Sequence, residues 1–190
     1  MSGDEATGTL VLVVGPSGAG KDTLIAHAKA ALDDRFVFPR RVVTRASSPW
    51  EEHDSVEPAE FDRMEAAGAF ALSWRAHGFA YGIPAAIRDD LRAGRTVVVN
   101  VSRGIVPQAR AELPRVSVIV VTAPADVISA RLSARGRDAG VASRRERAGI
   151  EVPLGANDTV VDNSGDLAPA QAHFLAAVMA AATSLRAVQR

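Results

Sequence analysis

The sequence predicts an α/β domain in which a parallel β-sheet core is flanked by helices. Short, almost wholly apolar runs at residues 9–14, 96–100 and 116–123 are typical of strands buried on both faces of a sheet. Segments with helical apolar spacing lie between these runs. Strands that alternate with helices favour parallel pairing, because a parallel connection needs a long crossover.

The 190-residue chain has the composition of one globular domain, with 47% apolar and 23% charged residues. No window approaches the roughly 18 apolar residues of a membrane span, and residues 1–8 lack the features of a signal peptide. The absence of cysteine excludes disulfides and thiolate metal sites, and a formal net charge of zero gives no sign of a nucleic-acid partner. We therefore expect a single cytoplasmic domain, residues 1–190, without a membrane or nucleic-acid partner.

A glycine-rich loop connects the first strand to the first helix, residues 22–32. It reads Gly15-Pro16-Ser17-Gly18-Ala19-Gly20-Lys21. Backbone N–H groups of such a loop and the helix N-terminus form a concave site of positive potential, to which the lysine adds a full charge. A glycine turn without a ligand is the alternative, but strand, loop and helix occur in the order that a phosphate-binding loop requires. The sequence predicts a nucleoside triphosphate site here.

The two residues after the lysine depart from the usual pattern. A Ser or Thr hydroxyl that meets Mg²⁺ normally follows the lysine, whereas this chain has Asp22 and then Thr23. Asp22 could hold Mg²⁺ directly or through water, or Thr23 could replace the missing hydroxyl. Both residues remain candidate metal ligands.

The next part of the chain is predicted to form smaller elements. Residues 41–44 form a short strand, residues 46–57 a polar loop, and Pro58 opens a helix over residues 59–67 that Gly68 ends. Residues 69–76 and 79–81 are expected to form a hairpin around His77-Gly78.

The remaining elements alternate again. We expect a helix that begins at Pro84 and runs to residue 91, then the apolar strands at 96–100 and 116–123. A helix over residues 125–132, a last short strand at 159–162 and a closing helix over residues 168–185 complete the prediction.

An arginine-rich segment lies between the helix at 125–132 and the last strand. Arg131, Arg135 and Arg137 occur where Gly136 and Gly140 permit bending. A lid over about residues 133–147 would bring guanidinium groups to a transferring phosphoryl group and exclude water. Such a stretch is often only a solvated loop, but its position after a phosphate loop favours the lid. Arg137 could equally be a surface residue.

Most of the chain, from residue 10 to about 178, resembles the guanylate-kinase branch of the nucleoside monophosphate kinases. The resemblance is carried by the phosphate loop, Thr44-Arg45, residues 61–68, Ser73-Trp74, His77-Gly78, Tyr81-Gly82, residues 131–136 and Asn163. It implies a P-loop kinase fold with a small acceptor-binding insertion at about residues 44–82, an arginine lid, and ATP and Mg²⁺ as co-substrate and metal. Gly15 to Thr23 and Asn163 would bind the nucleotide.

Several positions depart from guanylate kinases. The residue before the tryptophan, a glutamate that recognises guanine in that family, is Ser73, and a second acceptor-phosphate arginine is replaced by Ser47-Ser48. Residues 51–56 hold no aromatic side chain in place of the family's tyrosine. A site that reads a base loses discrimination without its polar partners, so guanine is not the expected acceptor.

The departures are themselves similar to the ribose 1,5-bisphosphate phosphokinase family. They are Gly20-Lys21-Asp22, the serine-rich loop after Thr44-Arg45 with Glu51 and His53, the hairpin sequence at 71–78, and Val99-Asn100-Val101-Ser102-Arg103. This resemblance implies ATP-dependent phosphorylation of a phosphorylated sugar, ribose 1,5-bisphosphate, to 5-phospho-α-D-ribose 1-diphosphate in phosphonate breakdown.

The resemblance also implies roles for single residues. Lys21, Arg131 and Arg135 would stabilise the transferring group. The acceptor site would comprise Arg45, Glu51, His53, Trp74, His77, Tyr81 and Asn100. Guanylate kinase, another small-molecule kinase and a silent interaction module remain alternatives. The module is least favoured, because such modules commonly lack the phosphate-loop lysine and lid arginines that this chain retains.

Overall fold

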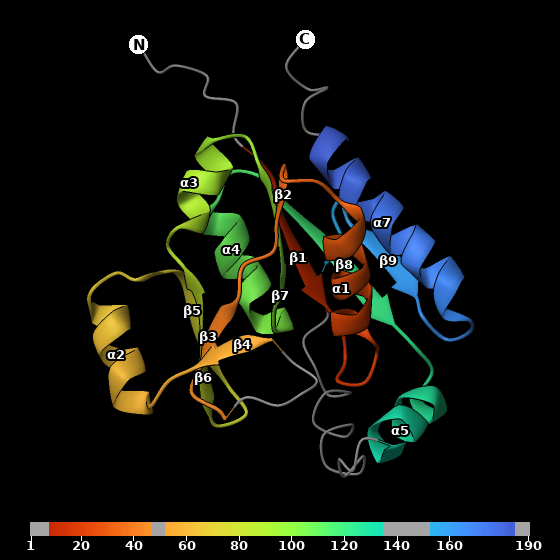
Figure 1. The fold of residues 1–190 in the computed structure, drawn as a ribbon, viewed down its shortest axis with the longest axis horizontal. Coiled ribbons are helices and arrows are strands. Elements are labelled where there is room, and N and C mark those ends of the chain that lie inside the picture. The colour runs from red at the N-terminus through yellow and green to blue at the C-terminus, as the bar shows by residue number, and fades with distance from the viewer. Residues whose placement is uncertain (1–7, 47–51, 135–152, 185–190) are drawn as a thin grey trace.

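The computed structural model describes residues 8–46, 52–134 and 153–184. Within these residues, five parallel strands form the main sheet in the order β2-β7-β1-β8-β9 (Figure 1). The strands are β1 (Leu10–Val14), β2 (Phe36–Val37), β7 (Thr96–Asn100), β8 (Val116–Thr122) and β9 (Thr159–Asp162). This arrangement confirms the predicted α/β fold class.

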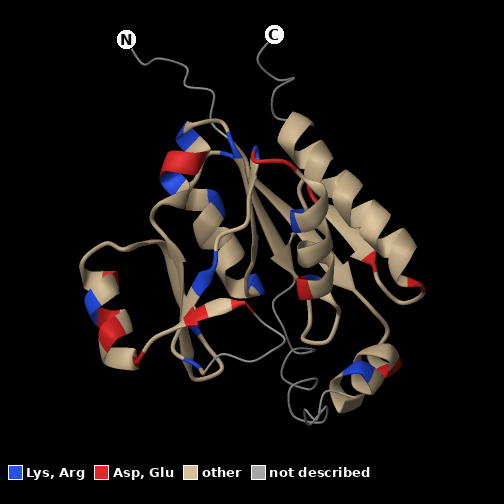
Figure 2. Ribbon diagram, in the orientation of Figure 1, with Lys and Arg blue, Asp and Glu red and all other residues tan. Residues whose placement is uncertain are grey.

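Helices cover both faces of the main sheet. Because successive side chains of a strand point to opposite faces, each strand contributes to both cores. Leu10, Leu12 and Val14 of β1 pack with α3 (Ile87–Arg92) and α4 (Val106–Glu112). Val11 and Val13 pack on the other face with α1 (Lys21–Ala31) and α7 (Leu167–Ser184). The described residues of α7 carry no charged side chain (Figure 2), as expected for an alanine-rich helix that covers a core.

A smaller sheet lies beside the main one, with the strand order β4-β3-β6-β5 (Figure 1). Its strands are β3 (Arg41–Val43), β4 (His53–Ser55), β5 (Phe70–Ala76) and β6 (Phe79–Pro84). The helix α2 (Pro58–Ala66) covers one face through Phe61, which is fully buried and packs with Val42 and Ala80. The predicted hairpin is confirmed as β5 and β6. It extends further than expected, because β6 continues to Pro84.

Several elements differ from the sequence prediction. Pro84 does not begin a helix. It ends β6 opposite Phe70, a strand end where its missing N–H costs no ladder bond, and α3 starts only at Ile87. The strand β4 lies in the stretch predicted as a polar loop, residues 46–57. The prediction missed it because only His53 of its three residues is buried and its sequence shows no apolar alternation. The short strand β2 and the pair formed by the 3-10 helix η1 (Arg103–Ile105) and α4 were not predicted.

The helix α5 (Ala125–Ala134) follows β8 beyond the carboxyl edge of the main sheet, at the lower end of Figure 1. Ligands of open α/β sheets bind at this edge. The predicted lid beyond residue 134 lies outside the described residues. Within the described part of the chain, no helix combines the length and apolar character needed to cross a bilayer.

Candidate active site

The phosphate loop requires glycine at its two ends. Gly15 has φ 149° and Gly20 has φ 92°, in the region that residues with a side chain rarely adopt. A Cβ atom on Gly15 would lie 2.2 Å from the Val121 carbonyl oxygen, and one on Gly20 would lie 2.3 Å from Asn163 Nδ2. The loop therefore packs directly against the ends of β8 and β9. This close packing needs the glycines that the motif predicted.

Asn163 holds the loop from the far end of the chain. Its Nδ2 donates to the Ala19 carbonyl at 2.8 Å, and its backbone N–H donates to the Thr122 carbonyl at 2.8 Å. The side chain is 2% exposed, and its Oδ1 has no hydrogen-bond partner within the described residues. Asn163, predicted to bind the nucleotide, is thus placed to support the loop, with one acceptor atom left for a ligand.

Lys21 lies at the loop that its charge is predicted to serve. Its Nζ donates to the carbonyl oxygens of Gly15 at 2.7 Å and Pro16 at 2.9 Å. Because these contacts fold the side chain back over its own loop, the ammonium charge is concentrated where a polyphosphate would bind.

The residue after the lysine is held by the neighbouring strand. Asn100 Nδ2 donates to Asp22 Oδ1 at 2.8 Å. Asn100 ends β7 and lies beside Val13 in the parallel register, whereas Thr23 is exposed. The structure therefore places the Asn100 amide against the residue that follows the phosphate-loop lysine. The contact with a ribose hydroxyl that the resemblance suggested stays a prediction.

Arg131 of α5 lies beside the same loop. Its Nη1 is buried without a hydrogen-bond partner in the described residues, and it lies 3.9 Å from where a Cβ on Gly20 would stand. Ile128 and Leu132 fix the helix by packing near Gly18. A buried guanidinium nitrogen with unused donor capacity next to a phosphate loop is suited to an anionic ligand. Arg135 lies outside the described residues.

The predicted acceptor side contains an aromatic stack tied to the main sheet. Trp74 of β5 and Tyr81 of β6 stack with ring centroids 5.3 Å apart and planes inclined by 8°. The Trp74 Nε1 donates to Ser102 Oγ, just beyond β7, at 2.9 Å. Tyr81 is buried. This hydrogen bond joins the small sheet to the segment that follows β7 of the main sheet.

Arg45 and His53 lie together at the start of the small sheet. His53 Nε2 is 3.2 Å from the Arg45 carbonyl oxygen, and the Arg45 guanidinium lies 5.7 Å from the centroid of the Phe79 ring. His53 is 2% exposed, and its Nδ1 has no partner in the described residues. His77 is exposed in the hairpin turn, with φ 52°. Glu51, also predicted for this site, lies outside the described residues.

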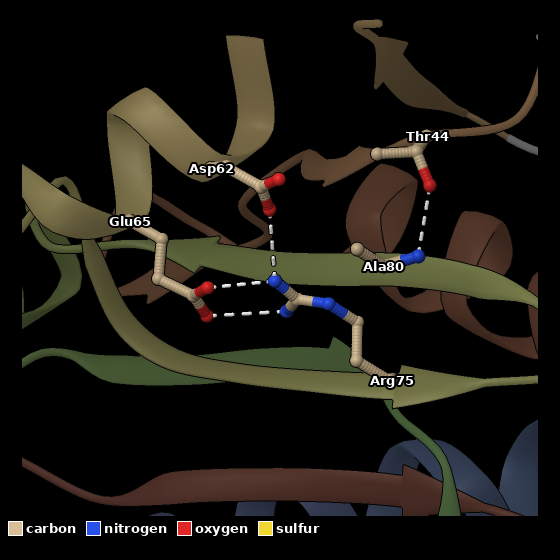
Figure 3. A network of polar contacts seen from close by, with 5 residues as sticks. All are labelled: Thr44, Asp62, Glu65, Arg75 and Ala80. Carbon is tan, nitrogen blue, oxygen red and sulfur yellow. Dashed lines mark hydrogen bonds and ion pairs between the residues drawn. The ribbon is translucent and has the colours of Figure 1, made fainter. Parts of the chain in front are cut away.

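The face of β5 that carries position 73 is occupied by an ion-pair network (Figure 3). Arg75 donates to Glu65 Oε2 at 2.7 Å and to Asp62 Oδ1 at 3.1 Å, and its guanidinium lies 4.9 Å from the Phe61 ring centroid. Hydrogen bonds from Arg75 and then Ser73 hold the pKa of Glu65 below its usual value. The carboxylates on this face are therefore engaged within the protein.

Sequence reasoning missed two structural contacts. Ser102 carried no signal of its own, because its partner Trp74 lies 28 residues earlier. Asp158 is the second case: its carboxylate, 2% exposed, accepts from the backbone N–H groups of Val118 at 2.7 Å and Gly155 at 2.6 Å, and pairs with Arg110. No spacing in the sequence indicates that these distant residues meet. The contacts of Asp158 fix the chain that leads into β9.

Comparisons with known proteins show what the chain is similar to. No family model matches the chain. A ribose 1,5-bisphosphate phosphokinase PhnN from Rhodopseudomonas palustris is 53% identical over 84% of this chain and 82% of that protein. The corresponding protein of Bradyrhizobium diazoefficiens is 50% identical over 83% of this chain and 81% of its own length. A bifunctional ribose 1,5-bisphosphokinase-thymidine phosphorylase from Cupriavidus necator is 49% identical over 92% of this chain, which spans 30% of that longer protein.

Solved structures show the same fold. A guanylate kinase from Anaplasma phagocytophilum superposes with a TM-score of 0.64 at 19% identity, covering 96% of this chain and 87% of the other. A gluconokinase from Sinorhizobium meliloti 1021 gives a TM-score of 0.57 at 20% identity, covering 98% and 99%. The fold is that of the P-loop kinases, as predicted. Because the chain is 53% and 50% identical to the two PhnN kinases over more than 80% of its length, it belongs to the PhnN family of ribose 1,5-bisphosphate phosphokinases.

Proposed function

We propose that the chain transfers the γ-phosphoryl group of ATP to the 1-phosphate of ribose 1,5-bisphosphate, which yields 5-phospho-α-D-ribose 1-diphosphate and ADP. The observation that carries this proposal is the 53% identity to a PhnN kinase over 84% of the chain, a share that extends well beyond the phosphate loop. The solved neighbours, at 20% identity or below, support the fold alone and leave the acceptor to be argued from the site.

The acceptor oxygen of this reaction is already an anion at neutral pH. A new bond forms between that phosphate oxygen and the γ-phosphorus, while the bond from the γ-phosphorus to the β,γ-bridging oxygen breaks and its electron pair leaves with ADP. No proton has to be removed, so no general base is required. The protein's task is to position the reactants and neutralise charge.

On the donor side, the phosphate loop would hold the ATP phosphates, and Lys21 would exchange its contacts with the Gly15 and Pro16 carbonyls for phosphate oxygens. Arg131 would direct its free guanidinium nitrogen at the transferring group. Arg135, from the segment after α5, would supply a second guanidinium. Mg²⁺, which supplies charge neutralisation at the phosphates when bound, typically takes one or two carboxylates together with phosphate oxygens. Asp22 has the chemistry for this role.

On the acceptor side, Arg45 and Tyr81 would bind a phosphate of the sugar, with the Trp74 ring packed against Tyr81. Within the described residues, the His53 ring contacts the Arg45 backbone, so its role would be to orient Arg45. His77 would contribute from the hairpin turn between β5 and β6, and Glu51, outside the described residues, remains a proposed member of the acceptor site. The Arg75–Glu65 network supports a non-purine acceptor, because the carboxylates near Ser73 already have partners.

The test compares acceptors directly. ADP release is followed with ribose 1,5-bisphosphate, GMP and gluconate, and the product is identified by ³¹P NMR as a diphosphate ester. We expect turnover with the sugar bisphosphate and at least 100-fold lower kcat/KM with the others. A preference for GMP or gluconate would refute the proposed acceptor.

The chain's two lysines, Lys21 and Lys29, provide a matched pair of variants. Lys21→Ala should remove most activity with little change in stability. Lys29→Ala, which deletes a lysine whose ion pair with Glu52 is exposed, is the control. If Lys21→Ala kept kcat within about threefold of the parent, a barrier change below about 1 kcal/mol, the role given to Lys21 would be wrong.

A further inference from the structure

The hydrogen bond between Asn100 and Asp22 joins two positions that matter for metal binding in P-loop enzymes. Asp22 lies in the first turn of α1, directly after the phosphate-loop lysine, and Asn100 ends the strand next to β1. In P-loop enzymes these two places hold the Mg²⁺ site: a Ser or Thr hydroxyl follows the lysine, and an acidic residue supplies the second group. Here the carboxylate follows the lysine, and a neutral amide stands on the strand.

The residue types are therefore exchanged, while the total charge of the pair is unchanged. One carboxylate and one neutral polar group face each other at 2.8 Å. The Asn100 amide donates, which fixes the Asp22 carboxylate through Oδ1 and leaves Oδ2 as an oxygen ligand. Thr23, the other candidate, is exposed and makes no such contact within the described residues.

The donor set suits Mg²⁺, which keeps several waters and takes one or two protein carboxylates with substrate phosphates. Across residues 8–46, 52–134 and 153–184, no group of three or more His, Cys, Asp or Glu side chains could form a metal cage. A single oriented carboxylate at the phosphate loop is what a metal carried by the nucleotide requires.

We propose that Asp22 is the protein ligand to the nucleotide's Mg²⁺ and that Asn100 is its positioning residue, so that the hydroxyl–carboxylate pair of other P-loop enzymes occurs here with its members exchanged. Asn100 then serves the donor site instead of the ribose. The inference rests on the proposed use of ATP but not on the identity of the acceptor.

The test measures metal binding without turnover. Free Mn²⁺ is titrated by electron paramagnetic resonance against the full-length protein saturated with the β,γ-imido analogue of ATP, and nucleotide binding is measured separately in EDTA. Asp22→Thr should weaken Mn²⁺ binding at least tenfold. The double variant Asp22→Thr/Asn100→Asp, which restores the usual order, should return the affinity to within about threefold of the parent.

Asn100→Ala separates positioning from contact with the sugar. Loss of an oriented partner typically lowers metal affinity by about tenfold or more, so Mn²⁺ binding should weaken while the KM for ribose 1,5-bisphosphate at saturating metal stays constant. Asp89→Thr, a first-turn carboxylate of α3 with an exposed partner in Arg92, is the matched control and should leave Mn²⁺ binding unchanged.

Three results would overturn the inference. They are Mn²⁺ affinity within twofold of the parent for Asp22→Thr, no recovery in the double variant, or an Asn100→Ala change confined to the sugar KM. Unaltered nucleotide binding in EDTA shows that the loop has kept its fold. Because the Mn²⁺ and nucleotide titrations need no acceptor, they remain valid if the proposed sugar proves wrong.

Discussion

Replacing Arg131 with methionine should separate stability from catalysis. The Nη1 of Arg131 is buried without a partner in the described residues, and an unsatisfied buried donor costs about 1–3 kcal/mol. Methionine keeps an unbranched stem and removes the donor. Taking the lower end of that range, because part of the side chain reaches solvent, we expect Arg131→Met to gain about 1 kcal/mol of unfolding free energy. For a chain of this length this corresponds to a rise in Tm of about 2–4 °C.

The same variant should lose activity. An arginine that neutralises charge on a transferring phosphoryl group accelerates the reaction by about 10³–10⁵-fold. We expect kcat to fall by about 10³, which equals a barrier increase of about 4 kcal/mol. Affinity for ATP should change much less, because the phosphate loop and Lys21 remain.

The assays are calorimetry or urea unfolding for stability and coupled ADP release for kcat. Arg75→Met is the control, since Arg75 already pairs with Glu65 and Asp62 within the protein. It should lose up to about 1 kcal/mol, as expected for half-exposed ion pairs, and keep kcat within about threefold. If Arg131→Met instead lost more than 1 kcal/mol of stability, or retained kcat within threefold, Arg131 would be a structural residue and the reasoning would fail.

Three further outcomes follow from contacts described above. Ser102→Ala should raise the acceptor KM several-fold and leave the ATP KM unchanged, because the Trp74 N–H loses its acceptor; Ser102→Thr should restore the parent KM in the same steady-state assay. Asp158→Ala leaves the Arg110 charge and the buried N–H of Val118 without their partner, so urea unfolding should show a loss of about 1–3 kcal/mol; a loss below 1 kcal/mol would contradict this. The folded-state pKa of Glu65 lies below 4.5, so its pairing stabilises fully above pH 4.5 and is lost as pH falls through the folded-state pKa; the stability gap between the parent and Arg75→Met should therefore shrink in acid, and a gap constant from pH 7 to 3 would argue against it.

The main sheet and the phosphate loop were predictable because their signals are local. Strands covered on both faces, such as β1 and β8, read as almost wholly apolar runs, and the loop's glycines satisfy backbone geometry and close packing within a few residues. By contrast, β4 could not be recognised, since one buried histidine among exposed neighbours carries no period. Pro84 misled the prediction because proline favours both the first turn of a helix and the end of a strand.

The partners within the site were less predictable than its members. Asp22 could be singled out from its position directly after the phosphate-loop lysine, and Arg131 from the arginine-rich segment that follows the helix at 125–132. That Asn100 would meet Asp22 depends on β7 lying next to β1, and 78 residues separate the two side chains. Sequence order does not determine strand order, so contacts of this kind emerge only from the assembled sheet.

The segment from Asn100 to Ser102 links the two proposed substrate sites. Asn100 contacts Asp22 of the proposed nucleotide site, Ser102 contacts Trp74 of the proposed sugar site, and the buried Val101 between them donates its N–H to the Val13 carbonyl at 3.0 Å. Two peptide units thus act as a spacer of fixed length between phosphoryl donor and acceptor. Inserting a single residue there would shift Ser102 relative to Asn100 and so change the distance between the two proposed substrate sites.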